Sequence, residues 1–176
     1  MTNLQPATSR KVIAFAIVLT SISLCPITPA LAQTSALQKE TPMTQHANGT
    51  FDVKITPQGT EDKEAAAGLG RMSIEKQIHG DLTGTSKGEM LTGMSEVKGS
   101  GAYVAIERIT GTLNGRTGSF ILQHAGTMAH GEQHLSITVV PDSGTGQLVG
   151  IAGTFNLTIT DGKHFYDLAY TLPETP

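Results

Sequence analysis

The chain has 176 residues, with 15 acidic and 12 basic side chains, 20 glycines, one cysteine and no tryptophan. Its length fits a single domain, and a formal net charge of −3 without a basic run disfavours binding to nucleic acid through neutralised phosphates. One cysteine excludes an internal disulfide and a zinc site built from cysteines.

Residues 1–32 have the three parts of a secretory signal peptide. Arg10 and Lys11 supply the positive charge, and residues 12–24 form an apolar stretch that is too short to span a bilayer comfortably. Ala30-Leu31-Ala32 then provides a small-residue cleavage pattern. The beginning of the chain therefore predicts export.

Cleavage after Ala32 would remove Cys25 and two basic residues, which leaves a cysteine-free chain with a formal charge of −5. We expect a periplasmic or secreted bacterial protein, without a membrane segment after cleavage. Translation from Met43 is the alternative, and it would give a cytoplasmic protein. Residues 33–43 are polar and unpatterned, which predicts a disordered leader ahead of one domain over residues 44–173.

Residues 44–173 are predicted to be all-β, because short runs of alternating apolar and polar residues are separated by glycine-rich turns. Only residues 61–67 have the composition of a helical turn. Eight strands are expected near residues 49–56, 68–78, 82–92, 101–112, 117–126, 132–140, 147–160 and 163–172. Eight consecutive strands favour an eight-stranded antiparallel up-and-down barrel, whose closure removes exposed edges. A β-sandwich is the alternative.

The first hairpin with a predictable register is expected around residues 79–81. A three-residue loop there would set Ile78 opposite Leu82. It would also bring Arg71 and Glu89 together on the outer face as an exposed ion pair.

Asn114-Gly115 predicts a type I′ hairpin turn of two residues. This loop sets Glu107 opposite Leu122 and leaves Glu107 diagonal to His124, within reach of long side chains. The residues expected on the inner face are Tyr103, Glu107, Ile109, Phe120, Leu122 and His124.

The outer face of the same hairpin is also apolar, because it carries Val104, Ile106 and Ile121. An exposed apolar patch of this kind is unusual on a monomer. The pattern therefore predicts a homo-oligomer.

Asp161-Gly162 predicts a second two-residue turn, between the last two strands. It sets Phe155 opposite Leu168 and Leu157 opposite Tyr166 on one apolar face. His164 and Tyr166 are therefore expected to point towards the core.

Four segments resemble a family of bacterial proteins known as domain of unknown function 3224. They are His79–Leu91, Gly101–Gly126, Val140–Gly153 and Asp161–Leu172. The resemblance covers about residues 44–172 and implies a small eight-stranded barrel related to the allene oxide cyclases. It implies a fold and no activity, so no catalytic residue is carried over from the cyclases.

The predicted inner faces bring together five polar or aromatic residues that could hold a ligand. They are Tyr103, Glu107, His124, His164 and Tyr166. A partly buried pair of Glu107 and His124 can orient a ligand, exchange a proton with it, or simply form a satisfied polar network in the core.

His130, Glu132 and His134 alternate along one strand, which is a spacing that could hold a metal. They have the opposite parity to Ile137 and Val139, so their face is expected to be wet, and we predict neither a metal site nor a cofactor.

The leading hypothesis is a non-enzymatic exported barrel that binds a small apolar molecule or self-associates. The alternative is a cyclase or isomerase that acts on an apolar substrate inside the barrel.

Overall fold

The computed structural model describes residues 43–59 and 68–173. The predicted signal over residues 1–32, all of the predicted leader except Met43, and residues 61–67 lie outside the described residues. In the part of the chain that is described, no helix is long and apolar enough to cross a bilayer.

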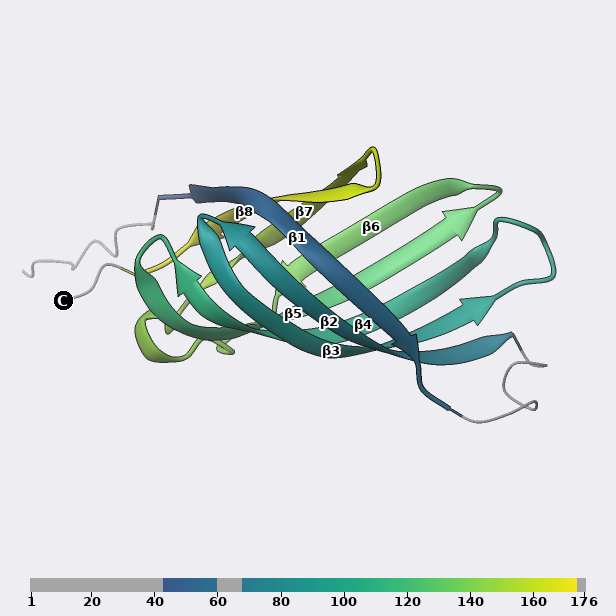
Figure 1. Cartoon of the computed structure of the whole chain (residues 1–176), viewed down its shortest axis with the longest axis horizontal. Coiled ribbons are helices and arrows are strands. Elements are labelled where there is room, and N and C mark those ends of the chain that lie inside the picture. Colours follow the sequence, from purple (N-terminus) through teal and green to yellow (C-terminus); the bar gives the residue numbers. More distant parts are fainter. Residues whose placement is uncertain (1–42, 60–67, 174–176) are drawn as a thin grey trace, which may run out of the picture. The chain divides into compact units, whose positions relative to one another are not determined.

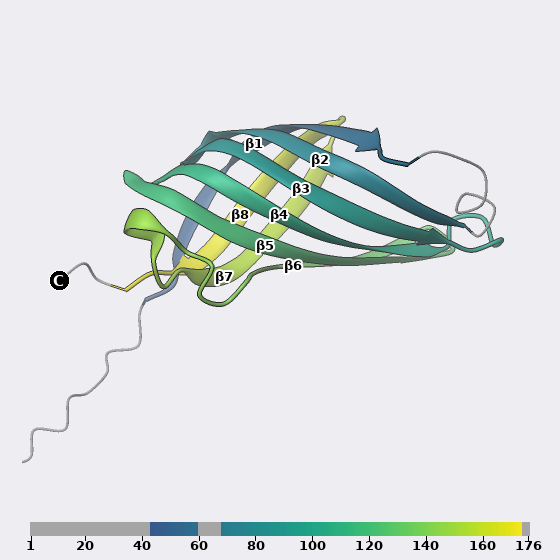
Figure 2. The same cartoon turned by 90° about the horizontal axis from the view of Figure 1, so that it is seen from below.

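Eight antiparallel strands form a closed barrel (Figure 1). They are β1 (Gln45–Pro57), β2 (Leu69–Gly80), β3 (Leu82–Met94), β4 (Gly101–Leu113), β5 (Arg116–Ala129), β6 (Glu132–Val139), β7 (Ala152–Thr160) and β8 (Lys163–Thr171). Each strand pairs with the next along the chain, and β8 returns to pair with β1 (Figure 2). The predicted up-and-down barrel is confirmed, and the sandwich is excluded.

The strand predicted near residues 147–160 begins later than expected. A short 3-10 helix, η1 (Gly146–Leu148), occupies its predicted start, and β7 begins at Ala152. Gly146 and Gly150 have φ angles of 58° and 83°, which lie in the left-handed region. This backbone conformation favours glycine and breaks an extended strand.

Both two-residue turns have the geometry that their sequences predict. Asn114 and Gly115 have φ angles of 45° and 84°, and Asp161 and Gly162 have 51° and 73°. Positive φ at both central residues is the requirement of a type I′ turn. The registers of the β4–β5 and β7–β8 hairpins are therefore confirmed, with Glu107 opposite Leu122 and Phe155 opposite Leu168.

The predicted register of the β2–β3 hairpin is wrong by two residues, because Ile78 lies opposite Gly84 rather than Leu82. The loop closes around a side chain from β8. The Leu82 amide donates to the Tyr166 hydroxyl at 3.0 Å, and that hydroxyl lies 3.2 Å from the His79 carbonyl oxygen. Since the shift is an even number, every side chain keeps its predicted face.

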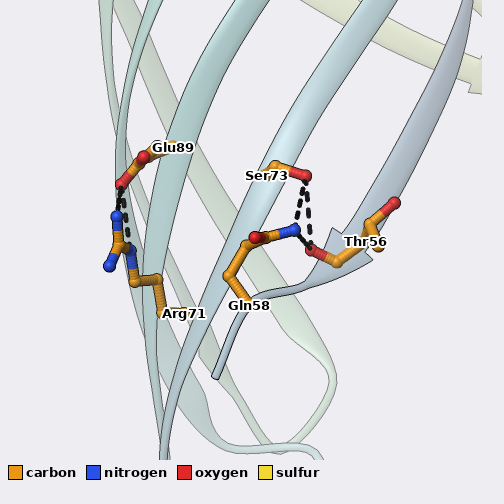
Figure 3. A network of polar contacts seen from close by, with 5 residues as sticks. All are labelled: Thr56, Gln58, Arg71, Ser73 and Glu89. Atoms are coloured by element: carbon orange, nitrogen blue, oxygen red, sulfur yellow. Dashed lines mark hydrogen bonds and ion pairs between the residues drawn. The ribbon is translucent and has the colours of Figure 1, made fainter. Parts of the chain in front are cut away.

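Arg71 and Glu89 form the predicted ion pair on the outer face (Figure 3), with 2.7 Å between Arg71 Nη2 and Glu89 Oε2. The shifted register makes the contact diagonal, because Glu89 lies opposite Ser73. Figure 3 also shows Gln58 donating to Ser73 Oγ at 3.1 Å, beside the end of β1. Both members of the ion pair are exposed, so it contributes about 0–1 kcal/mol to stability.

A packed core fills the end of the barrel at η1 and the β4–β5 turn. Its fully buried large apolar side chains include Leu82, Ile109, Leu113, Phe120, Leu148 and Leu168. Burial of each such side chain contributes about 1.5–3 kcal/mol. The other end, at the β3–β4 and β5–β6 connections, leaves space inside the barrel.

The barrel wall is weakest between β6 and β7. One residue pair, Thr138 and Thr154, joins these strands, whereas β7 and β8 pair over nine positions. Leu135 and Ile159 have the parity of inward-facing side chains, yet 42% and 58% of their surfaces are exposed. A cavity of about 250 Å³ lies at this seam.

Candidate functional site

A cavity of about 410 Å³ lies inside the barrel, between the packed core and the β3–β4 and β5–β6 connections. Its walls are mostly apolar. The apolar side chains that line it include Phe51, Val53, Ile55, Ile74, Met90, Met94, Met128, Leu135, Ile137, Phe155, Leu157 and Ile159. Leu135, Ile137, Phe155 and Leu157 also line the cavity at the β6–β7 seam, so the interior and the seam share a wall.

Three of the five predicted site residues line the cavity inside the barrel. They are Tyr103, His124 and His164. Glu107 is fully buried behind the wall and is bonded to His124. Tyr166 is not a lining residue, because its hydroxyl is held by the backbone of the β2–β3 loop.

Glu107 is the centre of a buried polar cluster. Its Oε1 accepts from Lys76 Nζ at 2.6 Å and lies 3.2 Å from His124 Nε2, and its Oε2 accepts from Ser86 Oγ at 3.1 Å. The sequence-based prediction that Glu107 and His124 come into contact is confirmed. With both oxygens bonded, Glu107 is a satisfied buried charge.

Burial alone would raise the pKa of Glu107, because it penalises the charged form. The hydrogen bond from His124 and the charge of Lys76 outweigh that effect and lower the pKa of Glu107 to about 2. The carboxylate is therefore ionised at neutral pH. Because an ionised carboxylate only accepts hydrogen bonds, His124 Nε2 carries a hydrogen and donates it to Glu107.

Lys76 is the site residue that the sequence reasoning missed. Its side chain is 7% exposed, and its Nζ lies 4.7 Å from the ring centre of Phe51 and 5.8 Å from that of Phe155. A signal was present, since Lys76 has the parity of the buried Ile74 and Ile78 on the same strand. Alternation along β2 thus points Lys76 inwards.

Tyr103 and His124 present free polar atoms to the cavity. Among the described residues, every buried side-chain nitrogen or oxygen has a hydrogen-bond partner. The Tyr103 hydroxyl and His124 Nδ1 have no such partner within this part of the chain, so both atoms are accessible from the cavity that their side chains line. Burial and the nearby charge of Glu107 raise the pKa of Tyr103, which keeps the hydroxyl protonated.

The ring of Tyr103 lies over a glycine on the neighbouring strand. Tyr103 is opposite Gly126, and a Cβ atom at Gly126 would lie 2.2 Å from Tyr103 Cε1. Any side chain at this position would therefore displace the ring. Gly126 thus helps to hold Tyr103 against the cavity wall.

His164 completes the aromatic part of the wall. Its ring stacks on Phe51, with 5.0 Å between ring centres and 28° between planes. Phe155 stacks in turn on Tyr166 at 5.2 Å. These contacts place an aromatic surface beside the ammonium of Lys76.

The alternating residues His130, Glu132 and His134, for which no metal site was predicted, lie at the surface. His134 Nε2 is 3.7 Å from Glu132 Oε1, and both side chains are exposed. His130 lies in the β5–β6 turn with a φ of 52°. Over residues 43–59 and 68–173, no group of three or more His, Cys, Asp or Glu residues could hold a metal ion.

Comparisons with known proteins agree on one family. The model of a family described as a protein of unknown function (DUF3224) matches residues 47–170. A crystal structure of a protein of unknown function from the same family, from Shewanella oneidensis MR-1, is similar with 43% identity and a TM-score of 0.70. The similarity covers 76% of this chain and 100% of that one. No curated protein matches the chain.

Proposed function

The chain belongs to the DUF3224 family, and from its cavity we propose that it binds a small, mostly apolar molecule inside the barrel. The observation that carries this proposal is the cavity itself, with apolar walls over most of its surface and the polar side chains of Lys76, Tyr103 and His124 in its lining. A volume of about 410 Å³ lies within the usual range of ligand sites, about 300–1,000 Å³.

The cavity also suits binding because of how the barrel is built. Eight strands enclose an interior that side chains can fill or that can hold one small ligand. Here the side chains fill one end only, and a single residue pair joins the wall at the β6–β7 seam beside the cavity. A ligand that enters the cavity would remove its apolar surface from water, and this burial favours binding by about 25 cal/mol per Å².

We expect the neutral fluorescent probe phenylnaphthylamine to bind at one site per chain, with saturation in a fluorescence titration. Leu157→Trp should fill part of the cavity and weaken binding at least about tenfold, because an indole then occupies the ligand's volume. Val149→Ser, at an exposed position that does not line the cavity, is the control and should leave binding unchanged. Absence of saturable binding, or equal binding by the Leu157→Trp variant, would contradict the proposal.

The geometry favours binding over the alternative of a cyclase or isomerase. A general acid or base works best with a pKa near the working pH, whereas the pKa of Glu107 is lowered to about 2. Both of its oxygens are already bonded, and it does not line the cavity. Glu107 therefore supports its neighbours and is poorly placed to exchange protons with a substrate.

Self-association is a second candidate function, and an exposed apolar patch favours it. Leu91 lies opposite Val104 on the outer face of β3 and β4, and Ile106 is next to them. Val104 and Ile106 are 56% and 52% exposed. Ile121, expected in the same patch, is half-buried, because its backbone is bonded to the β6–β7 link. We propose that a second copy of the chain covers the remaining patch.

Light scattering of the purified barrel is expected to give a mass above that of one chain at high concentration. The double substitution of Val104→Ser and Ile106→Ser should shift the protein towards monomer, since it removes the apolar surface that association would bury. Val149→Ser is a control for an exposed apolar residue outside both the patch and the cavity. A monomeric mass for the unsubstituted protein would rule out self-association through this patch.

Export by a signal peptide over residues 1–32 stays a prediction, since it rests on the sequence alone. It bears on where a ligand would be met: in the periplasm or medium after cleavage at Ala32, and in the cytoplasm if translation begins at Met43.

A further inference from the structure

We infer that the ligand is an apolar molecule that carries one anionic group, held in the cavity beside Lys76 and Tyr103. This inference rests on the proposed function, because it names the chemical class that the same cavity would accept. Two independent features of the cavity carry it: the sign of the groups that line it, and the kind of hydrogen-bonding groups left open.

The ionisable groups on the cavity wall are basic, apart from one tyrosine. They are Lys76, His124, His164 and Tyr103, together with His134, whose side chain is mostly exposed; the described lining residues include no aspartate or glutamate. Among the described residues, the acid bonded to this wall is Glu107, which lies behind it with a fully buried side chain. Lys76 and Glu107 thus form a dipole whose positive end faces the cavity, which favours a negative group there.

The donors of Lys76 and Tyr103 also fit an anion. Glu107, the strongest acceptor of the cluster, has both oxygens occupied by Lys76, His124 and Ser86. The Tyr103 hydroxyl is open to the cavity and can donate, and the Lys76 ammonium has three hydrogens, of which Glu107 takes one. An anionic group can accept from both, and hydrogen bonds to a charged partner are the stronger kind.

A cationic ligand fits poorly by the same reasoning. Its charge would lie beside the Lys76 ammonium, with no acidic side chain on the described wall to balance it. The aromatic faces of Phe51 and Phe155 could attract a cation, but Lys76 already lies over both rings. A neutral apolar ligand would still fill the cavity and would leave the open donors without partners.

The test compares two fluorescent probes that differ by one group: anilinonaphthalene sulfonate and phenylnaphthylamine, which lacks the sulfonate. At pH 7 the sulfonate probe is expected to bind at least about tenfold more tightly than phenylnaphthylamine. A gain of this size is typical of one hydrogen bond to a charged group. Leu157→Trp should weaken both probes, and Val149→Ser, at an exposed position away from the cavity, should weaken neither. Equal or weaker binding of the sulfonate probe overturns this inference and leaves the proposed function standing. Failure of both probes to bind overturns the proposed function itself.

Two substitutions test which groups recognise the anion. Tyr103→Phe should weaken the sulfonate probe about tenfold and leave the neutral probe unchanged, because it removes one open donor. Glu107→Gln should strengthen binding of the sulfonate probe about tenfold, because it removes the negative charge behind Lys76. A general loosening of the fold would weaken both probes, so a selective gain cannot arise from damage. An unchanged ratio of the two affinities in both variants overturns the inference.

Discussion

Replacing Lys76 alone with methionine is expected to lower the free energy of unfolding by about 3–5 kcal/mol. The substitution leaves Glu107 buried without its closest charged partner, 2.6 Å away, and only His124 and Ser86 remain bonded to the carboxylate. A buried charge without a partner is among the costliest changes that a core can suffer. Urea denaturation at pH 7 measures the loss.

Two further variants test whether the loss of stability comes from the broken Lys76–Glu107 charge pair. The double substitution of Lys76→Met and Glu107→Gln removes both charges and should recover more than half of the loss, since neutral groups of similar volume often replace a buried pair at little cost. Arg71→Met, on the same strand, breaks the exposed ion pair with Glu89 and should cost less than about 1 kcal/mol. Equal losses in the single and double variants would show that the charge pairing does not stabilise the fold.

Of the contacts in the Glu107 cluster, one was predictable from the sequence and one was not. The contact between Glu107 and His124 was predictable because Asn114 and Gly115 fix the loop length, and the loop length fixes every partner on the hairpin. Lys76 reaches Glu107 across β3, so their contact depends on three strands. Gly88 leaves room for it, since a Cβ there would lie 2.5 Å from Glu107 Cβ.

The features that could not be predicted have one physical cause in common: no short turn of known geometry fixes them. The β2–β3 register is set by the Tyr166 hydroxyl, which arrives from β8 only when the barrel closes. The open seam lies between β6 and β7, whose link is too long for any turn rule to fix a register. The cavity lies where the barrel lacks the large buried side chains that fill its other end.

Acidification is expected to reduce the stability of the barrel through Glu107. The pKa of this group is about 2 in the folded protein, against an ordinary value of 4.5. A lowered pKa means that the folded state favours the ionised form, so the contribution is fully present above about pH 4.5 and is lost as the pH falls towards 2. The shift corresponds to about 3 kcal/mol, at about 1.4 kcal/mol for each pH unit.

The measurement compares urea denaturation of the unsubstituted protein and the Glu107→Gln variant between pH 7 and about pH 3. The stability advantage of the unsubstituted protein should shrink by more than half over this range, because the glutamine side chain does not titrate. The other carboxylates are common to both proteins and cancel in the difference. Glu89→Gln is the matched control, because Glu89 is exposed, and its stability difference from the unsubstituted protein should change by less than about 1 kcal/mol. A constant advantage at every pH would contradict the assignment of this acid sensitivity to the Glu107 cluster.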